Sequence, residues 1–236
     1  MSRLAVIPAR GGSKRIPGKN IRLFHGKPML AYSIEAAQAS RLFDRIVVST
    51  DDPAIAQLAI ELGAEVPFSR PATLADDHAT TLAVMQHAVS VLCEPGGGAD
   101  YVCCLYATAP FVQATNLHRG FELLAENSTK SYAFSVTDFG FPVQRAIRIN
   151  EDGAVDALYP QYRDVRSQDL PPAFHDAGQF YWGRAAAWLR GDPLFSPLSL
   201  PVVLPRYLVQ DIDTLHDWRR AELMYQALLA SGELGG

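Results

Sequence analysis

Short apolar runs alternate along the chain with longer segments in which apolar residues recur at helical spacing. Residues 4–8 and 45–50 have the length and apolar content of buried strands, and residues 101–106 are apolar or aromatic at every position. Residues 80–92 instead place apolar side chains three or four positions apart, as one face of a helix requires. This alternation predicts an α/β fold with a mainly parallel sheet between layers of helices.

Turn and cap residues set most of the other predicted boundaries. Pro28 suits the first turn of a helix, and Asp51-Asp52-Pro53 offers an N-cap and a first-turn proline for a helix that ends near Gly63. The glycine-rich residues 94–98 end the helix of residues 80–92 in a turn. The remaining predicted strands cover residues 65–68, 132–136, 179–182 and 207–210, and the remaining helices cover 114–127, 184–190 and 214–230.

The regular pattern weakens between Asp138 and Pro172. Asn150 to Gly153 has the composition of a hairpin turn between two short strands, and residues 159–172 are polar and flanked by prolines. We therefore expect one domain over residues 1–236 with an excursion from the sheet at about 138–172.

Charge is distributed unevenly in this acidic chain of 236 residues. Asp and Glu number 25 against 21 Lys and Arg, which gives no electrostatic reason to bind nucleic acid or an anionic membrane. However, seven basic residues lie within the first 27 positions, and the first acidic residue is Glu35. They are Arg3, Arg10, Lys14, Arg15, Lys19, Arg22 and Lys27. This asymmetry predicts a local site for an anion.

The three cysteines indicate a reducing compartment. Cys93, Cys103 and Cys104 are odd in number, and two are adjacent, which suits neither a disulfide framework nor the paired spacing of a zinc site. No apolar run has the length of a transmembrane helix or a secretory signal. We expect a cytoplasmic protein with no membrane partner, in which Cys103 and Cys104 are core residues.

The segment that follows the first predicted strand combines glycine with basic residues. Loops at the carboxyl ends of strands bind ligands in open α/β sheets, and adjacent glycines leave backbone N–H groups free to contact phosphate. Gly12 and Gly18 are separated by five residues rather than the four of a P-loop, and no G-x-G-x-x-G is present. The simpler interpretation is a solvated basic turn, but so many cations without a carboxylate repel one another unless an anion is bound.

Two further segments carry polar groups at predicted strand ends. Asp211 and Asp213 alternate with Ile212, so that on a strand both carboxylates share a face and suit Mg²⁺ bound to phosphates. Alternatively, Asp213 is only the N-cap of the last helix. His175, Asp176 and Gln179 surround Gly178 at the start of a strand and suit a polyhydroxylated ligand, although His175 has a purely structural alternative.

Taken together, these motifs resemble the CMP-sialic acid synthetases, also called acylneuraminate cytidylyltransferases. The resemblance rests on Val6-Ile-Pro-Ala-Arg-Gly-Gly-Ser-Lys14, Lys19-Asn20, Val48-Ser-Thr-Asp51, Arg70-Pro71 and Asp211-Ile-Asp213. Residues 105–110, 166–170, 175–182 and 204–213 look like the pseudaminic acid branch of this family. Where the sialic acid enzymes show Gln-Pro-Thr-Ser-Pro and then Leu-Arg, this chain has residues 106–110 as Tyr-Ala-Thr-Ala-Pro and then Phe111-Val112.

The resemblance implies a Rossmann-like three-layer nucleotidyltransferase fold and transfer of CMP from CTP to a nine-carbon keto-sugar acid, with release of pyrophosphate. It also implies Mg²⁺ as cofactor and a homodimer formed through the excursion. The implied catalytic residues are Arg10, Lys14, Lys19, Asp211 and Asp213, the last two as metal ligands. The implied nucleotide contacts are Ala9, Arg10, Gly11, Gly12, Ser13, Lys19, Asn20, Arg70 and Thr81. The implied sugar contacts are Tyr106, Thr108, Arg166, Gln168, His175, Asp176 and Gln179.

Three alternatives to a pseudaminic acid cytidylyltransferase remain open at this point. An N-acetylneuraminate or legionaminate cytidylyltransferase differs in the loop of residues 106–112. A non-catalytic nucleotide-sugar-binding protein on the same fold has no need of Asp211 and Asp213. The failed dinucleotide motif disfavours a flavin or nicotinamide oxidoreductase.

Overall fold

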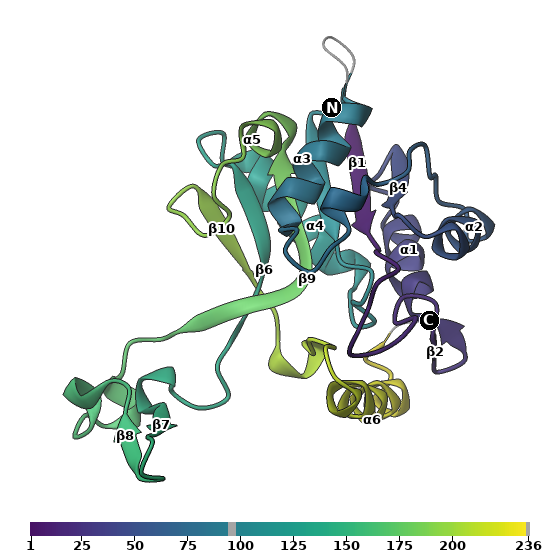
Figure 1. Ribbon diagram of the computed structural model, residues 1–236. Coiled ribbons are helices and arrows are strands. Elements are labelled where there is room, and N and C mark those ends of the chain that lie inside the picture. Colours follow the sequence, from purple (N-terminus) through teal and green to yellow (C-terminus); the bar gives the residue numbers. More distant parts are fainter. Residues whose placement is uncertain (94–97, 235–236) are drawn as a thin grey trace.

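A six-stranded sheet forms the centre of the molecule over the described residues, 1–93 and 98–234, of this computed structural model (Figure 1). Its order is β10-β6-β9-β5-β1-β4. The strands are β1 (Arg3–Pro8), β4 (Arg45–Ser49), β5 (Tyr101–Leu105), β6 (Tyr132–Asp138), β9 (Phe174–Arg184) and β10 (Ser199–Val203). β9 runs antiparallel to both of its neighbours, and the other pairings are parallel. The predicted mainly parallel α/β sheet is confirmed.

Helices cover both faces of the sheet. The helices are α1 (Met29–Ser40), α2 (Pro53–Glu61), α3 (Thr81–Leu92), α4 (Ala114–Glu126), α5 (Ala185–Arg190) and α6 (Leu215–Ser231). α1, α2 and α4 pack on one face, and α3 and α5 pack on the other. Because strand side chains alternate, Cys103 is buried in the first core and Cys104 in the second. Over the described residues, no helix combines the length and the apolar content that a bilayer crossing demands.

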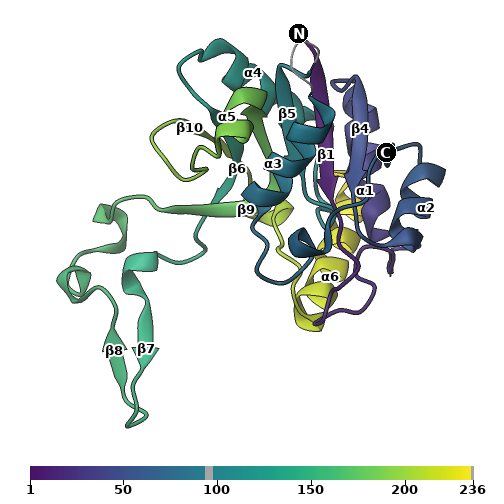
Figure 2. The same ribbon diagram turned by 45° about the horizontal axis from the view of Figure 1, so that its top comes forward.

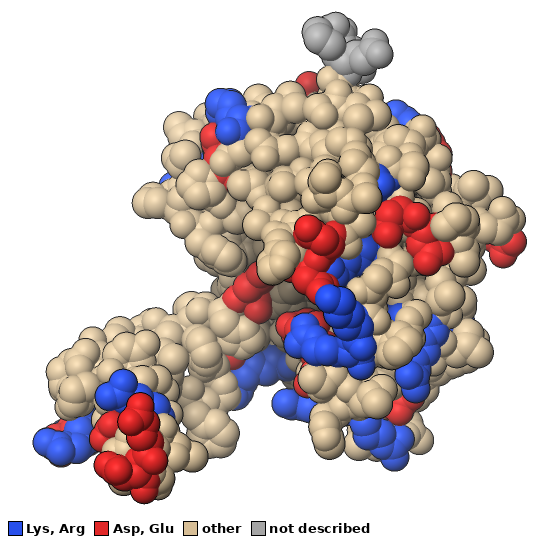
Figure 3. Space-filling view, in the orientation of Figure 1, with Lys and Arg blue, Asp and Glu red and all other residues tan. Residues whose placement is uncertain are grey.

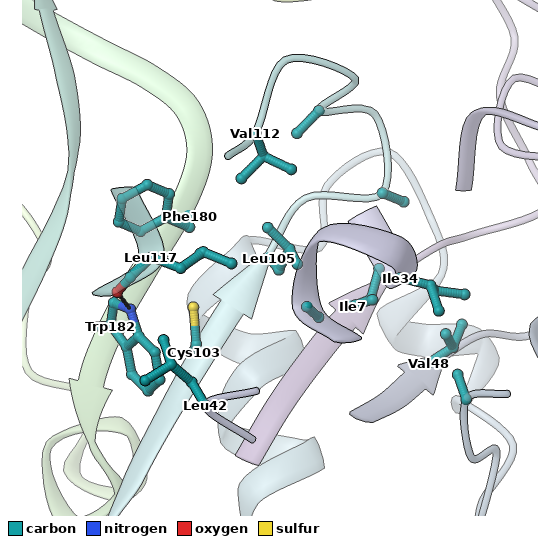
Figure 4. Close-up of a cluster of buried hydrophobic side chains, with 14 of the residues drawn as sticks. Ile7, Ile34, Leu42, Val48, Cys103, Leu105, Val112, Leu117, Phe180 and Trp182 are labelled. Atoms are coloured by element: carbon teal, nitrogen blue, oxygen red, sulfur yellow. Dashed lines mark hydrogen bonds between the residues drawn. The ribbon is translucent and has the colours of Figure 1, made fainter. Parts of the chain in front are cut away.

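The core under α1 and α4 is dense and apolar. Ile7, Ile34 and Val48 lie together on one side of it, and Trp182 donates its indole N–H to the Leu117 carbonyl at 3.0 Å (Figure 4). Because the Trp182 side chain is fully buried, this hydrogen bond gives its indole nitrogen the partner that water cannot supply.

Local cap chemistry explains the helix starts. The Asp52 carboxylate accepts hydrogen bonds from the backbone N–H groups of Ala54 and Ile55, and Pro53 occupies the first turn of α2, as expected. Thr80 caps α3 through the N–H of Ala83. Most of the turn expected at 94–98 lies outside the described residues.

A third apolar cluster attaches α6 to the N-terminal half of the chain. Ile16, from the loop after β1, and Ile212, just before α6, are both fully buried in it. The cluster also includes Phe24 of a two-stranded hairpin, β2 (Leu23–Phe24) and β3 (Lys27–Pro28), which the sequence pattern did not predict. These contacts hold two segments that are almost 200 positions apart against the same core.

Residues 139–173 leave the body as an arm, which Figures 1 and 2 show projecting away from the sheet. The arm carries a small antiparallel pair, β7 (Ile147–Ile149) and β8 (Val155–Ala157), so that the predicted hairpin is confirmed. Gly153 closes its turn with a φ of +77°, which glycine adopts without strain. Asp138 and Phe174 are paired neighbours on β6 and β9, so the arm is an insertion into one hairpin of the sheet.

Two strand predictions are wrong. Residues 207–210 do not form a strand, because Arg206–Leu208 is a 3₁₀ turn, and the last strand is instead β10. β10 contains Pro201, which an edge strand tolerates, and β6 is its sole strand partner among the described residues. Residues 65–68 do not form a strand either: Glu65 makes an isolated bridge with Val47, and a second bridge, Thr50–Ser69, lies just after this range.

Candidate active site

The loop of residues 9–20, here called the basic loop, starts at the carboxyl end of β1 and is fixed at both ends. The Gly11 N–H donates to Asp51 Oδ1 at 3.0 Å, and the Asn20 side-chain amide donates to the Arg10 carbonyl at 2.9 Å. Ala9 is buried, and Ile16 anchors the middle of the loop in the third cluster. Asn20 therefore braces the loop from within, while Gly12 and Ser13 lie along its surface.

Acidic side chains from elsewhere in the chain pair with the basic loop. Arg10 Nη2 lies 2.9 Å from Asp77 Oδ1, and Lys14 Nζ lies 2.5 Å from Asp77 Oδ2. Arg10 also donates to the Asp76 carbonyl at 2.6 Å. Hydrogen bonds and charge from Lys14 and Arg10 lower the pKa of Asp77. The expectation that these cations lack a carboxylate partner is wrong. Asp77, more than 60 positions away in the sequence, pairs with both of them in the structure.

The Asp211–Asp213 segment meets the other end of the basic loop. Lys19 Nζ donates to the Ile212 carbonyl at 2.6 Å and lies 3.5 Å from Asp213 Oδ1. Arg15, which sequence reasoning did not assign to the site, lies 2.8 Å from Asp213 Oδ2. The structure thus brings the basic loop and the Asp211–Asp213 segment together, although they are far apart in the sequence.

The strand that was expected to present these two aspartates is absent from the structure. The segment is irregular, and Ile212 points into the third cluster between the two acidic residues. Asp213 is not the N-cap of α6 either. Thr214 fills that position and forms a capping box with Asp217.

These two aspartates fit a Mg²⁺ ion held together with phosphate oxygens. Desolvation by surrounding protein and repulsion from Asp213 raise the pKa of Asp211, and Lys19 opposes the shift. A bound cation relieves this repulsion. Among the described residues, no cluster of three or more His, Cys, Asp or Glu side chains suits a metal. One or two carboxylates plus substrate phosphates are a usual set of ligands for Mg²⁺.

Arg70, Thr81 and Tyr106 make their contacts near the carboxyl ends of β4 and β5. Arg70 is buried and donates to Ser49 Oγ at 3.1 Å and to the Ser49 carbonyl. Burial lowers its pKa. Thr81 Oγ1 lies 2.9 Å from the Tyr106 hydroxyl, and burial raises the pKa of Tyr106 to about 12. Thr81 and Tyr106, which the resemblance assigns to different substrates, are therefore in direct contact.

The start of β9 presents Asp176 in a fixed orientation. Asp176 Oδ1 accepts the Gly178 N–H at 2.9 Å, and its other oxygen accepts the Tyr181 hydroxyl. His175 is exposed, with Nδ1 2.8 Å from the Asp176 carbonyl. Tyr181 was not foreseen as a functional residue, because its spacing is that of a core strand position.

Gln179 is placed differently from its two polar neighbours. Its side chain is buried, and its amide N–H donates to the Leu208 carbonyl at 2.5 Å. This contact ties β9 to the turn that precedes Asp211. Among the described residues, the buried Gln179 Oε1 has no hydrogen-bond partner.

A cavity of about 760 Å³, here called the arm cavity, lies where the arm joins the body. His175, Asp176 and Asp211 line it, together with Arg206 and Arg220, which sequence reasoning missed. Figure 3 shows basic side chains in the hollow between the arm and the region of α6. The arm cavity therefore reaches the aspartate segment at Asp211.

Of the seven predicted sugar contacts, only His175 and Asp176 line the arm cavity; the five that do not are Tyr106, Thr108, Arg166, Gln168 and Gln179. Thr108 is half-buried in the loop after β5. Arg166 and Gln168 lie in the arm, where Arg166 is 3.6 Å from Asp169. Within one chain, the arm holds these two residues apart from the basic loop (Figure 2).

A family model described as cytidylyltransferase matches residues 4–178, from β1 through the basic loop and β5 to the start of β9. The chain belongs to the cytidylyltransferase family. This cytidylyltransferase is 47% identical to the pseudaminic acid cytidylyltransferase of Campylobacter jejuni (strain 81-176), over 96% of this chain and 97% of that protein. It is also 31% identical to the CMP-N,N'-diacetyllegionaminic acid synthase of Legionella pneumophila, over 94% of this chain and 96% of that protein.

Solved structures agree with the fold. A CMP:2-keto-3-deoxy-manno-octonic acid synthetase complexed with CTP matches the cytidylyltransferase with a TM-score of 0.70 at 20% identity, over 97% of this chain and all of that chain. A 4-diphosphocytidyl-2C-methyl-D-erythritol synthase from Anaerococcus prevotii matches with a TM-score of 0.63 at 14% identity, over 95% of this chain and 98% of that chain. The expected nucleotidyltransferase fold and family are thus confirmed.

Proposed function

We propose that this cytidylyltransferase transfers CMP from CTP to pseudaminic acid, with Mg²⁺ as its cofactor. The anomeric hydroxyl oxygen forms a bond to the α-phosphorus, the bond from that phosphorus to the β-phosphate oxygen breaks, and pyrophosphate leaves as the hydroxyl loses its proton. One observation carries the proposal, namely that Lys19 of the basic loop contacts Asp213, two positions after Asp211, which lines the arm cavity. The sugar assignment is supported by 47% identity to the Campylobacter enzyme along nearly the whole of both chains.

The basic loop is the proposed triphosphate site. Arg10, Lys14 and Lys19 balance the phosphate charge, and Gly12 adds its exposed backbone to the same loop. The N–H groups of Gly11 and Ser13 already donate within the protein, to Asp51 and to the Gly11 carbonyl, and help to fix the loop. CTP exchanges for Asp77 on Arg10 and Lys14, an exchange of one anion for another. Ion pairs this exposed to solvent contribute little free energy, so the exchange costs little.

Asp211 and Asp213 are the proposed Mg²⁺ ligands. When bound there, Mg²⁺ supplies charge neutralisation at the α-phosphate and on the leaving pyrophosphate. Lys19 and Arg15 hold Asp213 in place, and the buried Ile212 fixes the segment between the two carboxylates. Asn20, Arg70 and Thr81 are the remaining proposed nucleotide contacts, with Asn20 acting by bracing the loop.

The arm cavity is the proposed sugar site. His175 offers it an imidazole and Asp176 a carboxylate. Tyr106, in the loop after β5, packs on Tyr181, whose hydroxyl donates to Asp176, and Thr108 follows in the same loop. Gln179 acts through Leu208 by holding the turn before Asp211. Arg166 and Gln168 reach a sugar only if the arm of a second chain contributes them.

This placement supports a homodimer. The arm exposes Phe141, Ile149 and Val155, and apolar side chains at this density are typical of a surface that packs on a partner. We propose that each arm packs on the body of the other protomer and completes its sugar site, and that residues 1–236 otherwise form one domain. A cytoplasmic location stays a prediction from the cysteines, which are free thiols.

The reaction is tested by incubating the protein with CTP, Mg²⁺ and one sugar acid at a time, following pyrophosphate and identifying the CMP-sugar by mass. The panel is pseudaminic acid, N,N'-diacetyllegionaminic acid, N-acetylneuraminic acid and 2-keto-3-deoxy-manno-octonic acid. We expect turnover with pseudaminic acid to exceed that with the others. Preference for another member overturns the sugar assignment alone.

The alternative of a non-catalytic binding protein predicts CTP binding without pyrophosphate release from any sugar acid. Arg10→Ala serves as the internal control. The proposal requires this variant to lose turnover by about 100-fold or more, as when one preorganised donor is removed, with an unchanged unfolding midpoint. Full turnover in that variant removes Arg10 from the mechanism.

A further inference from the structure

The arm cavity contains more acidic than basic side chains. Asp138, Asp176 and Asp211 line it, against Arg206 and Arg220. A sugar acid is itself an anion at neutral pH, and the three carboxylates repel it. Binding of such a substrate here requires a cation that is free to meet the substrate carboxylate.

Of the two arginines, Arg206 already has a partner. Its Nε lies 3.4 Å from Asp138 Oδ1, at the base of the arm. Arg220, on α6, forms no ion pair with any residue in the described part of the chain. It is therefore the cavity cation whose charge remains uncompensated.

The geometry of α6 directs Arg220 to the arm cavity. Met224 lines the same cavity and follows Arg220 by four positions, which places both side chains on one face of the helix. Trp218, Ala221 and Leu228 are buried in the third cluster and fix the rotation of α6. Arg219, the adjacent residue, does not line the cavity and lies 3.4 Å from Glu222.

We propose that Arg220 binds the carboxylate of the sugar acid and so selects for a keto-sugar acid over a neutral sugar. The inference rests on the function proposed above and adds the residue that recognises the acid group. A guanidinium suits this task because its paired N–H groups match the two oxygens of a carboxylate.

Kinetics of three variants test this role. Arg220→Gln is expected to raise the KM for the sugar acid by about 30-fold or more, since losing one partner of a charged hydrogen-bonded pair costs about 2 kcal/mol or more. In Arg220→Gln, the KM for CTP is expected to stay within about twofold of the wild-type value, and the unfolding midpoint within about 1 °C. Arg220→Lys restores part of the loss, and Arg219→Gln, the matched control on the same helix, leaves both KM values unchanged.

A second measurement uses the carboxamide of the same sugar acid, bound to the protein in the presence of CMP. The wild type is expected to bind the carboxamide at least about 30-fold more weakly than the acid, whereas Arg220→Gln binds the two equally. An unchanged KM in Arg220→Gln, an equal defect in Arg219→Gln, or retained discrimination in Arg220→Gln overturns the inference. Failure of the wild type with every sugar acid instead overturns the proposed function, so the two failures are distinguishable.

Discussion

Asp211 and Asp213 are two positions apart and have opposite electrostatic surroundings. Arg15 and Lys19 lie against Asp213, whereas desolvation and the charge of Asp213 disfavour the ionised form of Asp211. The raised pKa of Asp211 means that its contribution to stability is greatest below the ordinary pKa of aspartate and is lost as the pH rises through the raised value. At neutral pH an ionised Asp211 therefore costs stability until a cation binds.

Asp211→Asn should thus lose turnover and gain stability. We expect the unfolding midpoint at pH 7 without divalent cations to rise by about 1–2 °C, with the gain shrinking toward pH 3 as Asp211 becomes protonated in the wild type. Thermal unfolding in chelator, from pH 3 to 7, measures the effect. A lower midpoint for the variant at pH 7 contradicts it.

Asp213→Asn is the matched variant and should behave in the opposite way. It removes the pairs with Arg15 and Lys19, so we expect turnover to be lost and stability to fall by about 1 kcal/mol or less. Stabilisation in both variants would show that Asp211 and Asp213 do not differ in their electrostatic surroundings.

For single residues, the sequence indicated which charged side chains matter better than it indicated which side chains they contact. The acidic pair and the basic loop were both singled out, because charge type is visible in the sequence. Asp77, Arg15 and Arg220 were missed, since an ion pair or a cavity wall depends on positions that only the fold brings together.

The basic loop shows how an element of irregular structure is held in one shape. A Cβ at Gly11 would lie 2.9 Å from the Asp52 Cβ, closer than such atoms approach, whereas a Cβ at Gly12 meets nothing within 4 Å. Asp52 is also the N-cap of α2, so it has little freedom to withdraw.

Gly11→Ala is accordingly expected to destabilise the protein by about 1–3 kcal/mol, as overpacking does, and Gly12→Ala by about 0.5 kcal/mol or less. Urea unfolding of the two variants provides the comparison. Equal effects would show that contact with Asp52 does not restrict the loop.

Among the regular elements, prediction worked where the local signal was strong. The Asp52-Pro53 cap and the fully apolar β5 were both confirmed. β10 was missed because Pro201 disfavours a strand unless that strand lies at a sheet edge, and edge position is not visible in a single sequence. The error moved the last strand to residues 207–210, so the expected position of Asp211 and Asp213 near the basic loop rested on a strand that is absent.

At the scale of the whole molecule, the arm is separable from the sheet. Asp138 and Phe174 are paired neighbours, so a two-residue Asn-Gly turn can replace residues 139–173 and close β6 and β9 as a hairpin. The arm was predicted at about 138–172 from the loss of periodicity, but its projection away from the body has no signal in the sequence.

The shortened protein should fold and bind CTP, because the basic loop and Asp211 lie in the body. We expect it to be monomeric and to lose turnover, since the arm supplies Arg166, Gln168 and the proposed dimer contact. Light scattering, a CTP titration and the pyrophosphate assay measure the three properties. A monomeric full-length protein with full activity contradicts the dimer, whatever the shortened protein does.

The pairing of Asp77 with Arg10 and Lys14 has a consequence for ligand selectivity. Because its pKa is lowered, Asp77 stays ionised across the physiological pH range and competes with every incoming anion for the same two cations. If the basic loop holds the triphosphate as proposed, a nucleoside triphosphate that displaces Asp77 gains contacts along the loop, whereas inorganic phosphate gains few. We therefore expect Asp77 to lower the affinity of every anion for these two cations slightly, and to disfavour inorganic phosphate more than CTP.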